Sequence, residues 1–134
     1  MANLRNIEGI GETYAQKLQD IGLRTTKALL AKGATPHGRK EIAEQTGLSD
    51  ANILKWVNRA DLFRIKGIGE EYSDLLEAAG VDTVLELSHR VPENLHQKLA
   101  EVNAAKKLVR KLPALSQVKG WVAQAKKLPR GISF

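Results

Sequence analysis

The sequence contains no cysteine among its 134 residues. This absence excludes a disulfide framework, a thiolate zinc site and a cysteine nucleophile, and it favours an intracellular compartment. No apolar run approaches the roughly 20 residues that cross a bilayer, and the first residues lack the apolar stretch of a secretory signal peptide. We therefore expect a cytoplasmic protein with no membrane partner.

Aromatic residues are scarce throughout, and acidic residues are scarce in the last third. Aromatics make up only 4% of the chain. The formal net charge is +6, yet Lys98 to Phe134 holds 9 Lys/Arg against Glu101 alone and so carries +8, whereas the preceding residues carry −2. A basic excess of this kind favours a polyanionic partner. We therefore expect the last third to contribute most to any nucleic-acid-binding surface.

An internal repeat organises the sequence. The segment that begins at Ile7 reads IEGIGETYAQKL, and the segment that begins at Ile65, 58 residues later, reads IKGIGEEYSDLL. The match continues, with small gaps, through Gly22 and Gly80, Thr25 and Thr83, Leu29 and Leu87, and Trp56 and Trp121. Such self-similarity predicts a duplicated structural unit. We assign residues 1–62 to the first repeat and residues 63–134 to the second, which carries extra residues around Ala104 to Leu115.

Helix start and stop signals divide each repeat into short helices. In the first repeat the predicted helices follow Gly11, Thr25 or Thr26, Thr35 and Ser49, and the first three of them end near Gly22, Gly33 and Gly47. In the second repeat they span 72–79, 83–89, 92 to about 103, a basic segment that ends at Leu112, and 116–128. No segment has the strict alternation of a half-buried strand. The predicted class is all-α, with tandem helix-hairpin-helix repeats that form a compact pseudo-twofold body.

The recurring aromatic residues predict core positions. Tyr14 pairs with Tyr72 and Trp56 pairs with Trp121 between the two repeats. A base-stacking platform needs exposed rings along a basic groove. We therefore expect all four rings to be substantially buried.

Each Gly-Ile-Gly turn leads directly into a predicted helix. Glycine permits a positive φ and a close approach of the backbone, so successive N–H groups can point outward at the positive end of that helix. Such an arrangement suits a phosphate oxygen. It resembles the helix-hairpin-helix motif of DNA repair and recombination proteins, which holds the duplex backbone without reading sequence. The resemblance implies phosphate-binding amides at Gly9, Ile10, Gly11, Gly67, Ile68 and Gly69.

The chain as a whole resembles a bacterial family, domain of unknown function 4332. The resemblance rests on the two Gly-Ile-Gly turns, on the stretch ILKWVNRADLFRIKGIG from Ile53 to Gly69, and on AGVDTV from Ala79 to Val84. It covers nearly all of the chain. It implies tandem helix-hairpin-helix folds and a link to DNA.

Carboxylates flank both turns, which departs from the usual DNA-binding pattern. Glu12, Glu70 and Glu71 occupy the first turn of the following helices, where the helix dipole favours them and where they would repel a phosphate. The turns could therefore be purely structural. Lys66 stands beside the second turn, whereas Glu8 holds the equivalent place in the first. The second turn is accordingly the better phosphate candidate.

Two groups of basic residues are candidates for a polyanion surface. Lys106, Lys107, Arg110 and Lys111 have the spacing of one helix face, with Leu108, Val109 and Leu112 turned elsewhere. A second stripe, Lys119, Lys126, Lys127 and Arg130, lies opposite Trp121, Val122, Ala125 and Leu128. Charge runs also form ordinary solvated faces. Two stripes with almost no acid among them favour a nucleic-acid surface.

Two other groups of residues give weaker evidence for DNA reading or metal binding. Ala43, Gly47 and Ile53 have helix-turn-helix spacing, but the second helix offers only Asn52, Lys55 and Asn58 for base contacts, which favours an ordinary helical corner. His37, His89 and His96 lack metal-ligand spacing. We therefore expect no catalysis, no metal, no cofactor and no small-molecule substrate.

Two functions remain open from sequence. The first is a module that binds the DNA backbone without sequence preference, through the second turn and the basic stripes. The second is a protein-interaction or scaffold module with purely structural turns.

Overall fold

The computed structural model describes residues 3–134, so the first two residues of the predicted first repeat lie outside it. Within this range the chain forms eight α-helices, one 3-10 helix and a single isolated β-bridge between Asn3 and Thr25. The predicted all-α class is confirmed.

The chain divides into two units. The first comprises the chain up to Phe63 together with Gly131–Phe134, and the second comprises Arg64–Arg130. The duplication assigns Gly131–Phe134 to the second repeat, whereas the structure places them with the first unit.

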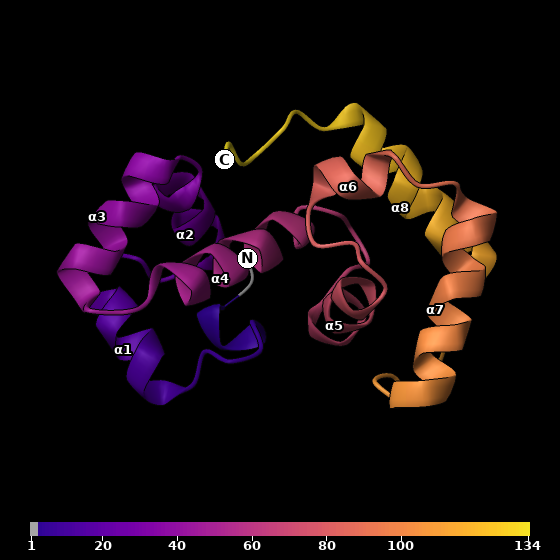
Figure 1. Cartoon of the computed structure of the whole chain (residues 1–134), viewed down its shortest axis with the longest axis horizontal. Coiled ribbons are helices and arrows are strands. Elements are labelled where there is room, and N and C mark those ends of the chain that lie inside the picture. Colours follow the sequence, from indigo (N-terminus) through magenta and orange to yellow (C-terminus); the bar gives the residue numbers. More distant parts are fainter. Residues whose placement is uncertain (1–2) are drawn as a thin grey trace. The chain divides into compact units, whose positions relative to one another are not determined.

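The first unit is built from η1 (Leu4–Asn6), α1 (Glu12–Asp20), α2 (Thr26–Gly33), α3 (Pro36–Thr46) and α4 (Asp50–Leu62). The second is built from α5 (Glu70–Ala78), α6 (Val84–Ser88), α7 (Pro92–Lys106) and α8 (Leu115–Lys127). Within the first unit α4 packs against α2 and α3, and within the second α8 packs against α6 and α7 (Figure 1). The packing of corresponding helices therefore recurs.

Local capping explains most of the helix starts. The side-chain oxygens of Thr25 and Thr83 accept hydrogen bonds from the amides of Ala28 and Glu86, at 3.1 and 3.2 Å, in corresponding places of the two units. The hydroxyl of Thr35 accepts from the amide of Gly38 at 3.1 Å, and Pro36 follows as the first helical residue. These bonds satisfy amides that a helix N-terminus leaves without partners.

A glycine with positive φ shapes each Gly-Ile-Gly turn. The φ angle is 92° at Gly9 and 95° at Gly67. A Cβ atom added at these glycines would lie 3.3 Å from Nε1 of Trp56 and 3.0 Å from Nε1 of Trp121, respectively. The turns thus need glycine both for backbone conformation and for the close approach of an indole ring.

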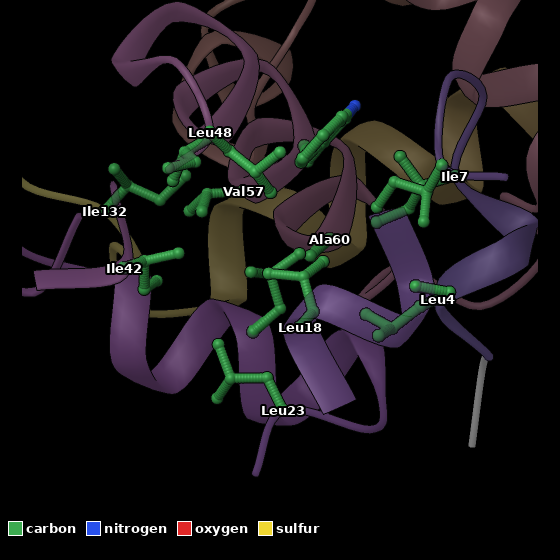
Figure 2. Close-up of a cluster of buried hydrophobic side chains, with 14 residues drawn as sticks. Leu4, Ile7, Leu18, Leu23, Ile42, Leu48, Val57, Ala60 and Ile132 are labelled. Atoms are coloured by element: carbon green, nitrogen blue, oxygen red, sulfur yellow. The ribbon is translucent and has the colours of Figure 1, made fainter. Parts of the chain in front are cut away.

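The two tryptophans anchor the cores, as predicted. Trp56 is 2% exposed and Trp121 is 3% exposed. Figure 2 shows the core of the first unit, in which Leu18, Ile42, Val57 and other side chains from η1 to α4 form one buried cluster.

The tyrosines are less buried than predicted. Tyr14 is 37% exposed, so its predicted burial is wrong, and Tyr72 is half-buried. Both rings lie against the tryptophan of their own unit, with centroids 5.3 Å apart for Tyr14 and Trp56 and 5.2 Å apart for Tyr72 and Trp121. The rings of each pair are tilted relative to one another, by 46° in the first unit and 54° in the second.

The predicted basic helix that ends at Leu112 is wrong. Helix α7 continues to Lys106, and the chain from Lys107 to Ala114 is not helical. Lys107 adopts the left-handed conformation, with φ 52° and ψ 47°, and its amide donates to the carbonyl of Asn103 at 2.8 Å. A left-handed residue at this place ends a helix.

We predict that Gly67→Ala lowers the free energy of unfolding by about 1–2 kcal/mol, because an L-residue resists the left-handed region and the new methyl group would press on Trp121. Gly69→Ala is the matched control, since Gly69 has φ −110° and no atom of the described chain lies within 4 Å of a Cβ there. Its effect should stay within about 0.5 kcal/mol. Urea unfolding of both variants measures the difference, and equal losses would contradict the proposed role of Gly67.

Candidate functional site

The second glycine turn presents backbone to solvent and buries its isoleucine. The amide of Ile68 donates to the carbonyl of Ile65 at 3.2 Å, and its side chain is 5% exposed. The amide of Ile10 makes the same bond to Ile7 at 3.1 Å in the first turn. Both isoleucine amides are therefore engaged within the turns, so the amides that remain for a ligand are those of the flanking glycines and of the first residues of the following helix.

Gly67 and Gly69 are both exposed, and Gly69 is the N-cap of α5 without a side-chain cap. No hydrogen bond within the described chain engages their amides. The N-terminus of α5 thus combines outward N–H groups with the positive end of the helix dipole.

Lys66 is held beside the second turn by a helix from the far end of the unit. Its amide donates to Oε1 of Gln124 at 2.9 Å, and its carbonyl accepts from Nε2 of Gln124 at 3.2 Å. The Lys66 side chain remains exposed. Lys127 is also exposed and follows Gln124 by three residues on α8, so it lies on the same side of that helix. Gln124 therefore connects Lys66, which adjoins the turn, to the helix that carries Lys127.

The basic segment from Lys106 to Lys111 contacts α5, the helix that follows the second turn. The hydroxyl of Tyr72, in the first turn of α5, donates to the carbonyl of Lys111 in a long hydrogen bond of 3.4 Å. The Tyr72 ring contacts Trp121, whose Nε1 faces Gly67. This chain of contacts links the basic segment to the turn.

All four cations of that segment are exposed, namely Lys106, Lys107, Arg110 and Lys111. They lie at the end of α7 and in the loop that follows, and not on one face of a helix.

Side chains of α7 hold this basic loop in place. The Asn103 amide donates from Nδ2 to the carbonyl of Val109 at 3.1 Å and accepts at Oδ1 from the Val109 amide at 3.0 Å. Nε2 of His96 lies 3.0 Å from the carbonyl of Pro113. Val109 and Pro113 are buried, so the loop is anchored while its cations face outward.

The other predicted basic residues have different surroundings. Lys119 lies 3.7 Å from a carboxylate oxygen of Glu93. Lys126 and Arg130 line a pocket of about 350 Å³ between α6 and α8, together with His89. Contacts therefore connect the second turn to Lys66, to helix α8, which carries Lys127, and to the basic segment, whereas Lys119 makes an ion pair.

The first turn has a different electrostatic setting. Glu8 takes the place of Lys66, and Glu12 at the start of α1 pairs with Nε of Arg5 at 3.1 Å. Gly9 and Gly11 are exposed like their counterparts. No basic loop of the kind that follows α7 exists in the first unit, because only Gly47–Ser49 connect α3 to α4.

Two carboxylates stand at the second turn. Glu70 and Glu71 are the first residues of α5, both are exposed, and neither makes an ion pair within the part of the chain that the structure describes. Their charges oppose those of the surrounding cations.

Sequence reasoning missed the residues that assemble this site. Gln124, Tyr72 as a hydrogen-bond donor, Asn103 and His96 act through partners between 6 and 58 residues away. A signal existed only for Asn103, since an asparagine near the end of a helix is suited to bonding free backbone groups.

The helix-turn-helix alternative corresponds to an ordinary corner between α3 and α4. Gly47 has φ 74° and Ile53 is fully buried. Asn52 and Lys55 are exposed, but Asn58 is half-buried, and its Oδ1 is buried without a hydrogen bond in the described chain. Two exposed polar side chains give little capacity to read bases.

Within residues 3–134 no group of three or more acidic or histidine side chains could hold a metal ion. No helix in this range is long and apolar enough to span a bilayer.

The helices, the paired glycine turns and the buried tryptophans define an all-helical protein of two units. A family model described as a domain of unknown function, DUF4332, matches residues 8–128, so the chain belongs to this family. The resemblance noted from sequence is thereby confirmed. No curated protein and no solved structure matches the chain.

We predict that Asn103→Ala releases the basic loop, because it removes both bonds to Val109. The free energy of unfolding should fall by about 1–2 kcal/mol, and hydrogen exchange at the Val109 amide should accelerate. Gln97→Ala, an exposed position on the same helix, is the control and should leave Val109 unchanged. Unaltered exchange at Val109 in Asn103→Ala would show that other contacts hold the loop.

Proposed function

We propose that this protein binds the nucleic-acid backbone, without sequence preference, through the second glycine turn and the basic loop of the second unit. The observation that carries the proposal is the chain of contacts from Lys111 through Tyr72 and Trp121 to Gly67. It makes an exposed basic loop and an exposed helix N-terminus neighbours. Phosphate is the chemical group that both features attract.

Different groups at this surface suit different phosphates. The amides of Gly67 and Gly69 and the N-terminus of α5 suit one phosphate group. Lys66, Lys127 and the four cations at and after the end of α7 suit the neighbouring phosphates along a strand. None of these groups reads a base edge, and contacts to phosphate carry no sequence information. Binding is therefore expected to depend on salt and to tolerate any sequence.

The glycine turn that leads into α5 supports assignment to the helix-hairpin-helix class within this proposal. Lys119, Lys126 and Arg130 contribute general positive potential in it, and the first turn, with Glu8 and Glu12, contributes little. The proposal places the protein in the cytoplasm and includes no catalytic step, no cofactor and no small-molecule substrate.

A scaffold function is the competing proposal, and one observation favours it. Glu70 and Glu71 are exposed at the helix N-terminus that phosphate would occupy. On that proposal the glycine turns serve only to seat the tryptophans, and a protein surface with basic groups meets the acidic turn.

We predict that replacing Lys106, Lys107, Arg110 and Lys111 with Gln weakens binding to duplex DNA of any sequence. Each neutralised phosphate contributes about 0.9 to the slope of log affinity against log salt, so the slope should flatten by up to about 3.6. A salt titration on two unrelated duplexes measures it.

The matched control replaces four exposed cations of the first unit, Lys17, Arg24, Lys27 and Lys40, with Gln. It removes the same net charge and should change the slope much less. Equal effects of the two variants would mean that net charge, and not the basic loop, governs binding. A parent protein that binds no DNA at low salt would leave the scaffold proposal standing.

We further predict that Glu70→Gln with Glu71→Gln tightens DNA binding about fivefold, since roughly 1 kcal/mol of repulsion is removed at short range. The control pair Asp20→Asn with Glu44→Gln, exposed in the first unit, should leave the affinity nearly unchanged. Circular dichroism must show that α5 survives the loss of two favourable charges at its start. Unchanged affinity in a folded variant would remove the second turn from the site.

A further inference from the structure

The last four residues of the chain form a docked peptide on the first unit. The segment Gly131–Phe134 has no helical structure and belongs to the first unit, although it follows α8 of the second. Ile132 is 3% exposed and is part of the same buried cluster as Ile42, Leu48 and Val57 (Figure 2). An apolar anchor from the end of the chain thus completes the core of the first unit.

Backbone hydrogen bonds fix this segment beside its anchor. The amide of Ser133 donates to the carbonyl of Ala34 at 2.7 Å, and the Ser133 hydroxyl reaches the same oxygen at 3.2 Å. Arg39 of α3 donates to the carbonyl of Ser133 and to the carbonyl of Gly33, both at 2.8 Å. Its guanidinium also lies 5.9 Å from the centroid of the Phe134 ring. The groove formed by these contacts buries the Ile132 side chain and holds the backbone of Ser133, whereas Phe134 is 64% exposed.

All of these contacts are made to the first unit, so they do not require that the tail and the groove come from the same chain. The tail is connected to α8 through Leu128, Pro129 and Arg130, which are not helical. The carbonyl of Pro129 accepts a hydrogen bond from Arg64 at 2.6 Å, so the exit from the second unit is fixed up to Pro129. Arg130 and Gly131 connect Pro129 to the docked tail, and Arg130 also lines the pocket between α6 and α8.

We propose that the groove formed by the end of α2, α3 and α4 is a self-association site, and that its partner is the Ile132–Phe134 tail of a second copy of this chain. The contacts in such an exchanged pair are identical to those within one chain. Exchange of the segment between two copies therefore costs little free energy. The chain's own tail competes for the groove with the tail of a second copy, at an effective concentration set by its tether. The fraction of exchanged pairs therefore increases with protein concentration.

A tail peptide tests the groove. The probe is a labelled peptide with the sequence of Leu128 to Phe134, and the acceptor is the full chain with Ile132→Asp, whose own tail no longer fits an apolar groove. We expect this variant to bind the peptide at least tenfold tighter than the parent, whose groove is occupied. A peptide with Asp in place of its Ile should not bind, and adding Arg39→Ala to the acceptor should weaken binding several-fold. Equal binding to the parent and to a folded Ile132→Asp variant overturns the proposal.

A cysteine trap tests exchange between copies without disturbing the apolar core, and the absence of native cysteine keeps it unambiguous. The Ala34→Cys and Ser133→Cys variants are mixed and mildly oxidised, and the double variant is oxidised alone. We expect the double variant to close mainly within one chain. The mixture should form a covalent pair in a yield that increases with concentration.

The matched control for the trap mixes Ala34→Cys with Ser116→Cys, an exposed serine of α8. A mixture that yields no more covalent pair than this control, while the double variant closes within one chain, shows that the tail does not exchange and overturns the proposal. A double variant that fails to close at all contradicts the docked tail itself and overturns the proposal equally. Neither result bears on DNA binding, because the groove and the basic loop lie in different units.

Discussion

The contact between a left-handed glycine and an indole ring is the constraint on which each unit depends. At Gly9 and Gly67 the missing side chain leaves room for Nε1 of Trp56 and Trp121. The same glycine sets the turn that inserts the following isoleucine into the core and leads into the next helix. The tyrosine in that helix then lies over the tryptophan. The turn, the core and the start of the helix therefore depend on one another, and the same contacts recur in both units.

Sequence patterns predicted the parts of this fold whose causes are local. Thr25, Thr35 and Ser49 begin helices because their hydroxyls bond amides three residues ahead. The segment after Asn103 was mispredicted because its leucines and lysines also have helical spacing. What ends the helix is the side chain of Asn103, which reaches the backbone of Val109 across a left-handed Lys107. Hydrophobic periodicity reports the spacing of side chains and contains no information about such a competing hydrogen bond.

The candidate site was only partly foreseeable for a related reason. The glycine turns and the basic residues are visible in the sequence, but their adjacency is not. Gln124 holds Lys66 from 58 residues away, and Tyr72 meets the basic loop across 39 residues. The engagement of the Ile68 amide within its own turn likewise follows from the fold. Comparison of the units shows what has diverged, since the first keeps the turn and lacks both the flanking lysine and the loop.

The two proposed binding surfaces lie in different units of the chain. The second unit has a loop after α7 that buries Val109 and exposes three cations, whereas the first unit has a short α3–α4 connection and accepts Ile132 from the tail. Exchange of the tail therefore leaves the second glycine turn and the basic loop untouched. An exchanged pair would carry two such surfaces. Two weak phosphate-binding surfaces joined in one particle bind a long polyanion far more tightly than either alone, because the second contact becomes intramolecular. Self-association through the first unit would then convert salt-sensitive, sequence-independent contacts of the second unit into stable residence on nucleic acid.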